Sequence, residues 1–87
     1  MTYLHIGADV SVRTEEIVGI FDLDNASSSH ITRAFLRQQE SSGAVVNVAE
    51  DLPKSFVVCR EKTGSKTYLS QLNSATLLKR AEQGSFE

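Results

Sequence analysis

Two carboxylates that stand two residues apart are the first feature of this sequence that could do chemistry. Asp22 and Asp24 close the apolar stretch VGIFDLDN, residues 18–25, where a strand would give way to a loop. A phosphoaspartyl enzyme begins its active site in this way, with the first aspartate as nucleophile and the second as acid and base. Such an enzyme also needs a doubly wound parallel sheet, a lysine for charge balance and further carboxylates for Mg²⁺.

Neither of the two sites that begin with this pattern fits the chain. Phosphohydrolases of the haloacid-dehalogenase type need several βα units after the aspartates, and 87 residues leave too little room for them. In an EF-hand calcium loop that starts at Asp22, the twelfth position is Arg33 instead of glutamate and the sixth is Ser27 instead of glycine. We therefore interpret Asp22 and Asp24 as the polar end of a strand near a helix N-terminus, where carboxylates are stabilised.

Three other reactive side chains have structural interpretations. His5 falls in a strand that we expect to be buried, His30 in the exposed first turn of a helix, and Cys59 at the end of an apolar strand. Their spacing does not suit a metal site, the chain has no G-x-S-x-G motif, and its five glycines are too scattered for a phosphate-binding loop. We predict no enzymatic activity, no metal and no cofactor.

Length and composition limit the classes of protein to consider. The 87 residues predict one domain, residues 1–87, with a small core. No apolar run reaches the roughly 18 residues that a membrane helix needs, and no export signal is visible. Cys59 is the one cysteine, so an internal disulfide is impossible and a cytoplasmic location is expected.

The charge of the chain is unevenly distributed, although the net value is only −2. Residues 1–51 carry three basic and eight acidic side chains, net −5, while residues 52–87 carry six basic and three acidic ones, net +3. The negative net charge argues against nucleic acid as a partner, whereas the uneven distribution of charge along the chain is compatible with one basic face. Solvated surface charge without a special role is the alternative interpretation.

The elements that would position these residues alternate between groups of strands and single helices. Apolar runs and period-two alternation predict strands over residues 3–6, 10–13, 17–21, 44–48, 56–59 and 67–69. The dense run at 17–21 is typical of a central strand buried on both faces, and Gly64 indicates a hairpin tip between the last two strands. The order strands, helix, strands, helix indicates an α+β fold.

Helical spacing of apolar residues predicts two helices. One extends over residues 28–41 and ends at Gly43 as a C-cap glycine. The other is capped by Asn73 or Ser74 and extends toward the C-terminus. We expect the tail, about residues 83–87, to fray.

Three segments in order resemble the RemA/RemB family of bacterial extracellular matrix (biofilm) regulators, with the RemB-type members as the nearer branch. They are YLHIGADVSVRTEEIVGIFDLD (residues 3–24), PKSFVVC (53–59) and YLSQLNSATLLKRA (68–81). The resemblance extends over nearly the whole chain. It rests on the order and spacing of the segments, because no single motif is diagnostic of a chemistry.

This resemblance implies a cytoplasmic α+β protein with a small, mainly antiparallel sheet and two helices, likened to LytTR-type DNA-binding domains and assembled into a closed ring. RemA-type members bind double-stranded DNA around such rings and activate matrix genes, whereas the molecular role of RemB-type members is less defined. The implied partners are further copies of the chain, DNA and a paralogous regulator, with no membrane. A ring would also close the sheet edges that an isolated domain of this strand content leaves open.

Two departures from the RemA-type pattern bear on DNA binding. RemA-type proteins have an arginine after the second strand, where this chain has Glu16, and an arginine pair before the strand of residues 56–59, where it has Pro53 and Lys54. Phosphate contacts supply much of the nonspecific affinity for DNA, so the loss of several contacts per subunit would weaken binding. Arg33, in contrast, matches a basic helix position of the family.

Two functions follow as hypotheses. The first is a DNA-binding transcriptional regulator of biofilm matrix genes, whose ring contacts the DNA backbone. Its candidate contact residues are Arg33, Arg37, Lys54, Arg60, Lys62 and Lys66. The second is an oligomeric scaffold or regulatory partner that binds protein instead of DNA, which the acidic first half of the chain favours. We favour the regulator because the resemblance is broad.

Overall fold

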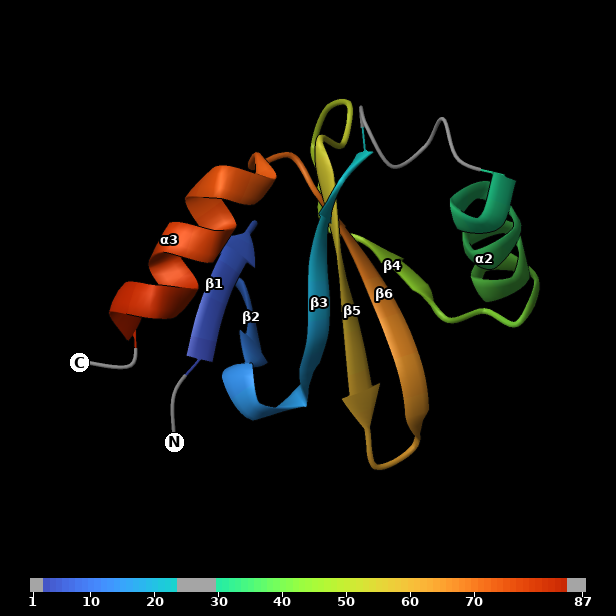
Figure 1. Ribbon diagram of the computed structural model, residues 1–87, viewed down its shortest axis with the longest axis horizontal. Helices are drawn as coiled ribbons and strands as arrows, with labels where there is room; N and C mark the ends of the chain where they lie inside the picture. Colours follow the sequence, from blue (N-terminus) through green and yellow to red (C-terminus); the bar gives the residue numbers. More distant parts are fainter. Residues whose placement is uncertain (1–2, 24–29, 85–87) are drawn as a thin grey trace.

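The chain folds into three layers, with a four-stranded sheet between a ribbon-and-helix layer on one side and a single helix on the other (Figure 1). The computed structural model describes residues 3–23 and 30–84. In chain order the elements are β1 (Tyr3–Gly7), β2 (Val10–Arg13), the 3₁₀ helix η1 (Thr14–Glu16), β3 (Ile17–Asp22), α2 (His30–Ser41), β4 (Val45–Asn47), β5 (Ser55–Glu61), β6 (Gly64–Ser70) and α3 (Ser74–Gly84). The predicted α+β class is confirmed.

The strands form two sheets. β1 and β2 make an antiparallel ribbon, and the other four strands make a sheet in the order β3-β5-β6-β4. β5 is antiparallel to both of its neighbours, while β4 is parallel to β6. The pairing is therefore mainly antiparallel, as predicted, but the expectation of one sheet is wrong. Local apolar runs indicate that strands exist, whereas their division between sheets depends on contacts far apart in the sequence.

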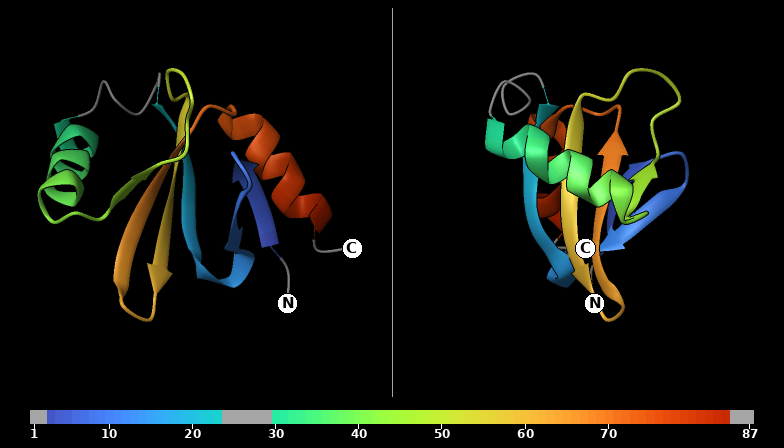
Figure 2. Two further views of the ribbon diagram at one scale, coloured as in Figure 1. Left: turned by 180° about the vertical axis from the view of Figure 1, so that it is seen from behind. Right: turned by 90° about the vertical axis from the view of Figure 1, so that its right-hand side faces the viewer.

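The edge strands β3 and β4 lie at opposite sides of the sheet, and α2 crosses its outer face between them (Figure 2). The prediction that residues 17–21 form a central strand buried on both faces is wrong, because β3 pairs only with β5 among the described strands. Ile17 and Ile20 pack against the core, but Val18 is 68% exposed and Phe21 is 42% exposed. The apolar run on β3 therefore packs against the core on one face of the strand and is exposed on the other.

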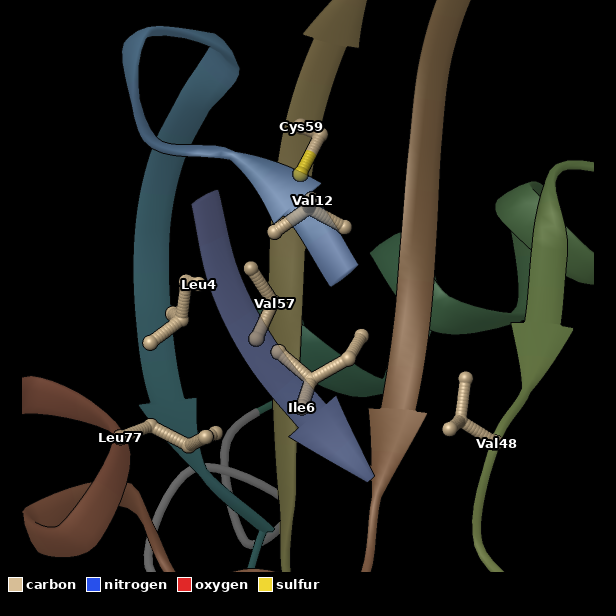
Figure 3. Close-up of a cluster of buried hydrophobic side chains, with 7 residues drawn as sticks. All are labelled: Leu4, Ile6, Val12, Val48, Val57, Cys59 and Leu77. Atoms are coloured by element: carbon tan, nitrogen blue, oxygen red, sulfur yellow. The ribbon is translucent and has the colours of Figure 1, made fainter. Parts of the chain in front are cut away.

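The main core lies between the β1–β2 ribbon, α3 and the inner face of the sheet (Figure 3). Its buried apolar residues are Leu4, Ile6, Val12, Val48, Val57, Cys59 and Leu77. Two buried hydroxyl groups tie the layers together. Ser70 Oγ donates a 2.7 Å hydrogen bond to the backbone oxygen of Ile6, and Ser55 Oγ donates one of 2.7 Å to that of Leu72. Each hydroxyl satisfies a carbonyl beyond its own strand and so fixes how the layers are stacked.

Local chemistry explains where the helices begin and end. The backbone N–H of Gly43 donates to the oxygen of Glu40 at 3.0 Å, and Gly43 has the positive φ of 74° that a C-cap glycine adopts. Asn73 Oδ1 accepts a 2.7 Å hydrogen bond from the backbone N–H of Thr76, which makes Asn73 the N-cap of α3. Both predicted helices are confirmed within the described residues; positions 28 and 29, predicted as helix, lie outside them. α3 includes residues 83 and 84 of the expected tail, and 85–87 lie outside the described residues.

α2 is tied to the sheet near its C-terminal end. Thr67 Oγ1 donates a 3.0 Å hydrogen bond to Gln39 Oε1, and the backbone N–H of Thr67 donates one of 2.8 Å to the oxygen of Ala44. No residue of α2 is fully buried. The helix therefore rests on the sheet without a closed core beneath it, and its N-terminal half borders an open groove. Neither α2 nor α3 is long and apolar enough to cross a membrane.

Candidate nucleic-acid interface and apolar groove

Two of the six predicted DNA-contact residues lie together on the outer side of α2. Arg33 and Arg37 are exposed and stand one helical turn apart. With Leu36 and Glu40 they line a shallow hollow on the helix surface. The Nη2 of Arg33 lies 3.5 Å from Nδ1 of His30 at the start of the helix. Two cations on one exposed helix face can contact phosphates, although Glu40 reduces the local positive charge.

Three more predicted residues lie at the turn between β5 and β6. Arg60 stands opposite Ser65 next to the turn, which contains Lys62, and both basic side chains are exposed. Lys66 is half-buried, and its Nζ lies 3.7 Å from Oε1 of Glu61. This turn therefore presents two exposed cations and a third that is already paired with a carboxylate.

Lys54, the sixth predicted residue, lies just before β5, away from the turn. Lys54 and Arg60 are six residue steps apart along extended chain, which corresponds to about 20 Å. One subunit therefore places the predicted contact residues in three separate locations: α2, the β5–β6 turn and the start of β5. A continuous basic surface would require contributions from neighbouring subunits.

Glu16, which replaces a basic residue of the RemA-type pattern, lies in η1 at the same end of the molecule as the β5–β6 turn (Figure 1). η1 packs against β5. The carboxylates of Glu61 and Glu16 both act on Cys59: burial, followed by these two charges in that order, raises the pKa of the thiol to about 11. The two carboxylates therefore oppose the charge of Arg60 and Lys62 at this end.

An apolar groove of about 300 Å³ lies between the outer face of the sheet and the N-terminal half of α2. Its lining residues are Val18 and Phe21 of β3, Phe56 and Val58 of β5, and Ile31, Thr32 and Phe35 of α2. We call this feature the apolar groove. Six of its seven lining side chains are apolar. The rings of Phe21 and Phe56 stack with centroids 5.0 Å apart and planes inclined by 20°. The shape of the groove is therefore partly fixed by an aromatic pair.

Sequence reasoning missed the apolar groove because the apolar run at residues 17–21 is typical of a central strand buried on both faces. Val18 is 68% exposed and Ile31 is 83% exposed at the rim, while Phe56 is buried at the floor. One feature of the sequence could have indicated the groove: the short segment that forms β3 has apolar side chains on both faces. Such a strand is central, or it is an edge strand with a second apolar surface.

The residues considered for catalysis or metal binding remain separate. Asp22 ends β3 opposite Ser55, and Asp24 lies outside the described residues. Residues 3–23 and 30–84 contain no group of three or more histidine, cysteine, aspartate and glutamate side chains placed to hold a metal. His30 is exposed at the start of α2, as predicted, whereas the prediction that His5 is buried is wrong. The alternation along β1 buries Leu4 and Ile6 and turns His5 to solvent.

Cys59 is fully buried, as the sequence predicts for a packed thiol. Its pKa, raised to about 11 by burial first and by Glu61 and Glu16 next, keeps the thiol protonated at neutral pH. A protonated and inaccessible thiol is a poor nucleophile. The role of Cys59 in this structure is therefore to fill the core.

Known proteins with similar sequences are extracellular matrix regulators. The chain matches the family described as "RemA-like: Extracellular matrix regulatory protein A-like" over residues 3–81. It is 44% identical over 80 residues to "Extracellular matrix regulatory protein B" of Bacillus subtilis (strain 168), and the match covers 92% of this chain and 90% of that protein. Both names describe regulators, and neither names a reaction. The extent of both matches shows that this chain belongs to the RemA-like family of extracellular matrix regulatory proteins.

Proposed function

We propose that this protein is a DNA-binding transcriptional regulator of biofilm matrix genes that acts in the cytoplasm as a closed ring of identical subunits. Membership of the RemA-like family supports the regulatory role. The observation that carries the DNA-binding part is the pair Arg33 and Arg37, both exposed on the solvent side of a helix that has no fully buried residue. Each subunit of a ring would present one such helix to the duplex.

The chemistry of the candidate residues favours contact with phosphates over reading of bases. Exposed arginines and lysines attract the DNA backbone by charge, and this attraction is independent of sequence. The six candidates lie in three separate locations, so one subunit offers only a few contacts in any one direction. A ring repeats these contacts along the DNA, and repetition raises the overall affinity through multivalency.

The two free edges of the main sheet support ring assembly. Within the described residues, β3 pairs only with β5 and β4 pairs only with β6, and these edges lie on opposite sides of the subunit (Figure 2). Unpaired edges are usually covered in soluble proteins. Two different surfaces on opposite sides suit a head-to-tail contact, which produces a ring when the rotation between subunits closes.

The test is a binding titration with long and short duplexes at two salt concentrations. Replacing both Arg33 and Arg37 by alanine should lower affinity for every sequence about equally, by at least about tenfold on the long duplex, and should reduce the slope of log affinity against log salt. Lys79→Ala/Arg80→Ala is the matched control, because it also removes two exposed cations, from α3 on the opposite side of the sheet. Wild-type affinity in the double variant, or an equal loss in the control, would contradict contact through α2.

A second candidate function is an oligomeric scaffold or regulatory partner that binds protein, such as a paralogous family member, and no DNA. The apolar groove favours it, since an exposed apolar surface of this kind is typical of a protein contact. The net charge of −5 over residues 1–51 favours it as well. If no variant binds DNA at low salt while the protein associates with a purified paralogue, this second function replaces the first.

A further inference from the structure

The apolar groove is open to solvent along its rim. Val18 on the β3 side is 68% exposed and Ile31 on the α2 side is 83% exposed, while Phe56 lies buried at the floor. None of the side chains that line the groove is acidic or basic. A concave apolar surface that stays in contact with water is typical of a site that binds another molecule.

The strand that forms the floor carries a basic residue beyond each end of the groove. Phe56 and Val58 face the groove, on the outer side of the sheet. Since side chains alternate along a strand, Lys54 and Arg60 lie on this side too, and both are exposed. The strand pairing continues to Lys54, because its backbone N–H donates a 2.8 Å hydrogen bond to the oxygen of Ser70. The outer side of β5 therefore presents a basic, two apolar and a basic residue in order.

Neither of these two cations is neutralised within the subunit. Lys54 and Arg60 form no ion pair with another residue in the described part of the chain. Glu61 follows Arg60 directly, but alternation turns it to the inner side of the sheet, where its carboxylate accepts the hydrogen bond of Tyr68. Both cations are therefore available to carboxylates of an incoming molecule.

We infer that the apolar groove and these two cations form a docking site for a short acidic segment of another protein, in which carboxylates stand on both sides of one or two large apolar side chains. The inference rests on the second candidate function, protein binding, and specifies its partner; it requires neither DNA binding nor a ring. The apolar side chains would fill the groove between the Phe21–Phe56 pair and α2. The carboxylates would lie beside Lys54 and Arg60.

The spacing of the cations favours a protein segment over a small molecule. Lys54 and Arg60 are six residue steps apart, about 20 Å, so one molecule that meets both must span this length. A pocket for a small molecule encloses most of its ligand, whereas the rim of this groove is open. DNA would meet the cations but has no large apolar group to fill the groove. Burial of apolar side chains would supply the affinity, and the two cations would select an acidic partner.

The first experiment selects peptides from a random library displayed on phage, with the full chain as the target. The enriched peptides should carry an aromatic residue, leucine or isoleucine flanked by aspartate or glutamate. A fluorescently labelled peptide of this kind should bind the wild type. It should bind Val18→Asp and Ile31→Asp at least about tenfold more weakly, because each places a charge at an exposed position of the rim.

Leu78→Asp is the control for these two variants, since it makes the same change at a 48% exposed position of α3, on the opposite side of the sheet (Figure 1). It should bind the peptide like the wild type. Enriched peptides that lack acidic residues would overturn the inference. Equal binding by the wild type and the two rim variants would also overturn it.

Charge reversal tests the two cations separately from the groove. Lys54→Glu/Arg60→Glu should weaken binding of the acidic peptide about tenfold at low salt and much less at high salt. The same variant should bind more tightly than the wild type a peptide in which lysines replace the acidic residues. Lys79→Glu/Arg80→Glu makes the same charge change on α3 and should alter both affinities much less. Without this exchange of preference the inference fails.

Two measurements test other occupants of the groove. Val18→Asp should have the same mass as the wild type by light scattering after gel filtration; a smaller mass would assign the groove to a second copy of the chain and overturn the inference. Vesicles of phosphatidylcholine and phosphatidylglycerol should not bind. Binding of these vesicles to the wild type but not to Val18→Asp would assign the groove to a membrane and overturn the inference too.

These outcomes separate the inference from the proposed function. Peptide binding is measured without DNA, so a chain that binds the acidic peptide and no DNA would contradict the DNA-binding regulator and support the docking site. A chain that binds DNA but yields no acidic apolar peptide would leave the regulator intact and overturn the docking site alone.

Discussion

Tyr68 Oη donates a 2.6 Å hydrogen bond to Oε2 of Glu61, and this bond joins β6 to β5 close to their turn. The same carboxylate lies 3.7 Å from Nζ of Lys66 through its other oxygen. Tyr68 is partly buried and packs against the core. Glu61 thus holds together the end of the hairpin that also carries Arg60 and Lys62.

Tyr68→Phe should lower the free energy of unfolding by about 1 kcal/mol, because it removes one charge-assisted hydrogen bond and leaves the ring in place. Urea denaturation will measure the change. A double-mutant cycle with Glu61→Ala, which removes the acceptor, isolates the pair and should give a coupling energy of about 0.5–1.5 kcal/mol. Strict additivity of the two substitutions would show that the bond does not contribute.

Stability should fall at high pH because Cys59 ionises less readily in the folded chain than in the unfolded one. Burial, and to a smaller extent the negative charges of Glu61 and then Glu16, raises the pKa of the thiol from an ordinary 9.0 to about 11. The folded state therefore holds its proton over a range in which the unfolded state has lost it. This contribution is fully present below pH 9 and should decrease by about 2 kcal/mol as the pH rises to 11.

Denaturation at a series of pH values will measure how the free energy of unfolding decreases with pH. Burial also raises the pKa of Tyr68, with help from its hydrogen bond to Glu61, so Tyr68 changes stability in the same direction at still higher pH. Cys59→Ala is the appropriate comparison: it will be less stable throughout because it leaves a cavity, but its stability should depend less on pH between 9 and 11. An unchanged slope in this variant would show that another group is responsible.

Gly19→Ala should deform the apolar groove. A Cβ at position 19 would lie 2.6 Å from Cζ and 2.7 Å from Cε2 of Phe21, so the ring must shift, and this disturbs its stacking on Phe56. We expect a loss of about 1 kcal/mol in stability from the stacked pair and weaker binding of any protein partner that uses the groove. Gly43→Ala is the control, because its added Cβ meets no atom within 4 Å and its cost comes from a φ of 74°. Gly43→Ala should lower stability and leave the binding of a partner at the groove unchanged.

Glu16→Arg should strengthen DNA binding. The change removes one negative charge and adds a positive one at the end of the subunit that carries Arg60 and Lys62, and a ring repeats it in every copy. The salt dependence should steepen by roughly one unit for each new phosphate contact. Glu82→Arg makes the same charge change on α3 and should increase affinity much less. Equal effects of the two substitutions would place the DNA elsewhere than at this end.

Local features of the sequence predicted the helices well. The spacing from Ile31 to Gln38, the glycine at position 43 and the cap at Asn73 depend on interactions within a few residues of chain. The strands over residues 44–48 and 56–59 were also recognisable, since β-branched side chains favour extended backbone. Each of these signals is carried by residues that contact one another in the folded element.

The position of each strand in a sheet could not be predicted in the same way. Val18 and Phe21 are as apolar as core residues, and only the presence of α2 across the sheet shows that they border a groove. The six basic candidates illustrate the same difficulty. Arg33 and Arg37 share a helix face by spacing alone, whereas the distance from Lys54 to the β5–β6 turn depends on how the whole of β5 is placed.

α2 has a further consequence for how this protein would respond to its partners. Ile31 and Phe35 of the helix border the apolar groove, while Arg33 and Arg37 face outward from the same two turns. With no residue fully buried, the helix is fixed to its own subunit by few contacts. A protein partner bound in the groove and a duplex bound at the arginines would therefore constrain the same helix from two sides. Partner binding and DNA binding would then be thermodynamically coupled, and each would change the affinity for the other by the same factor.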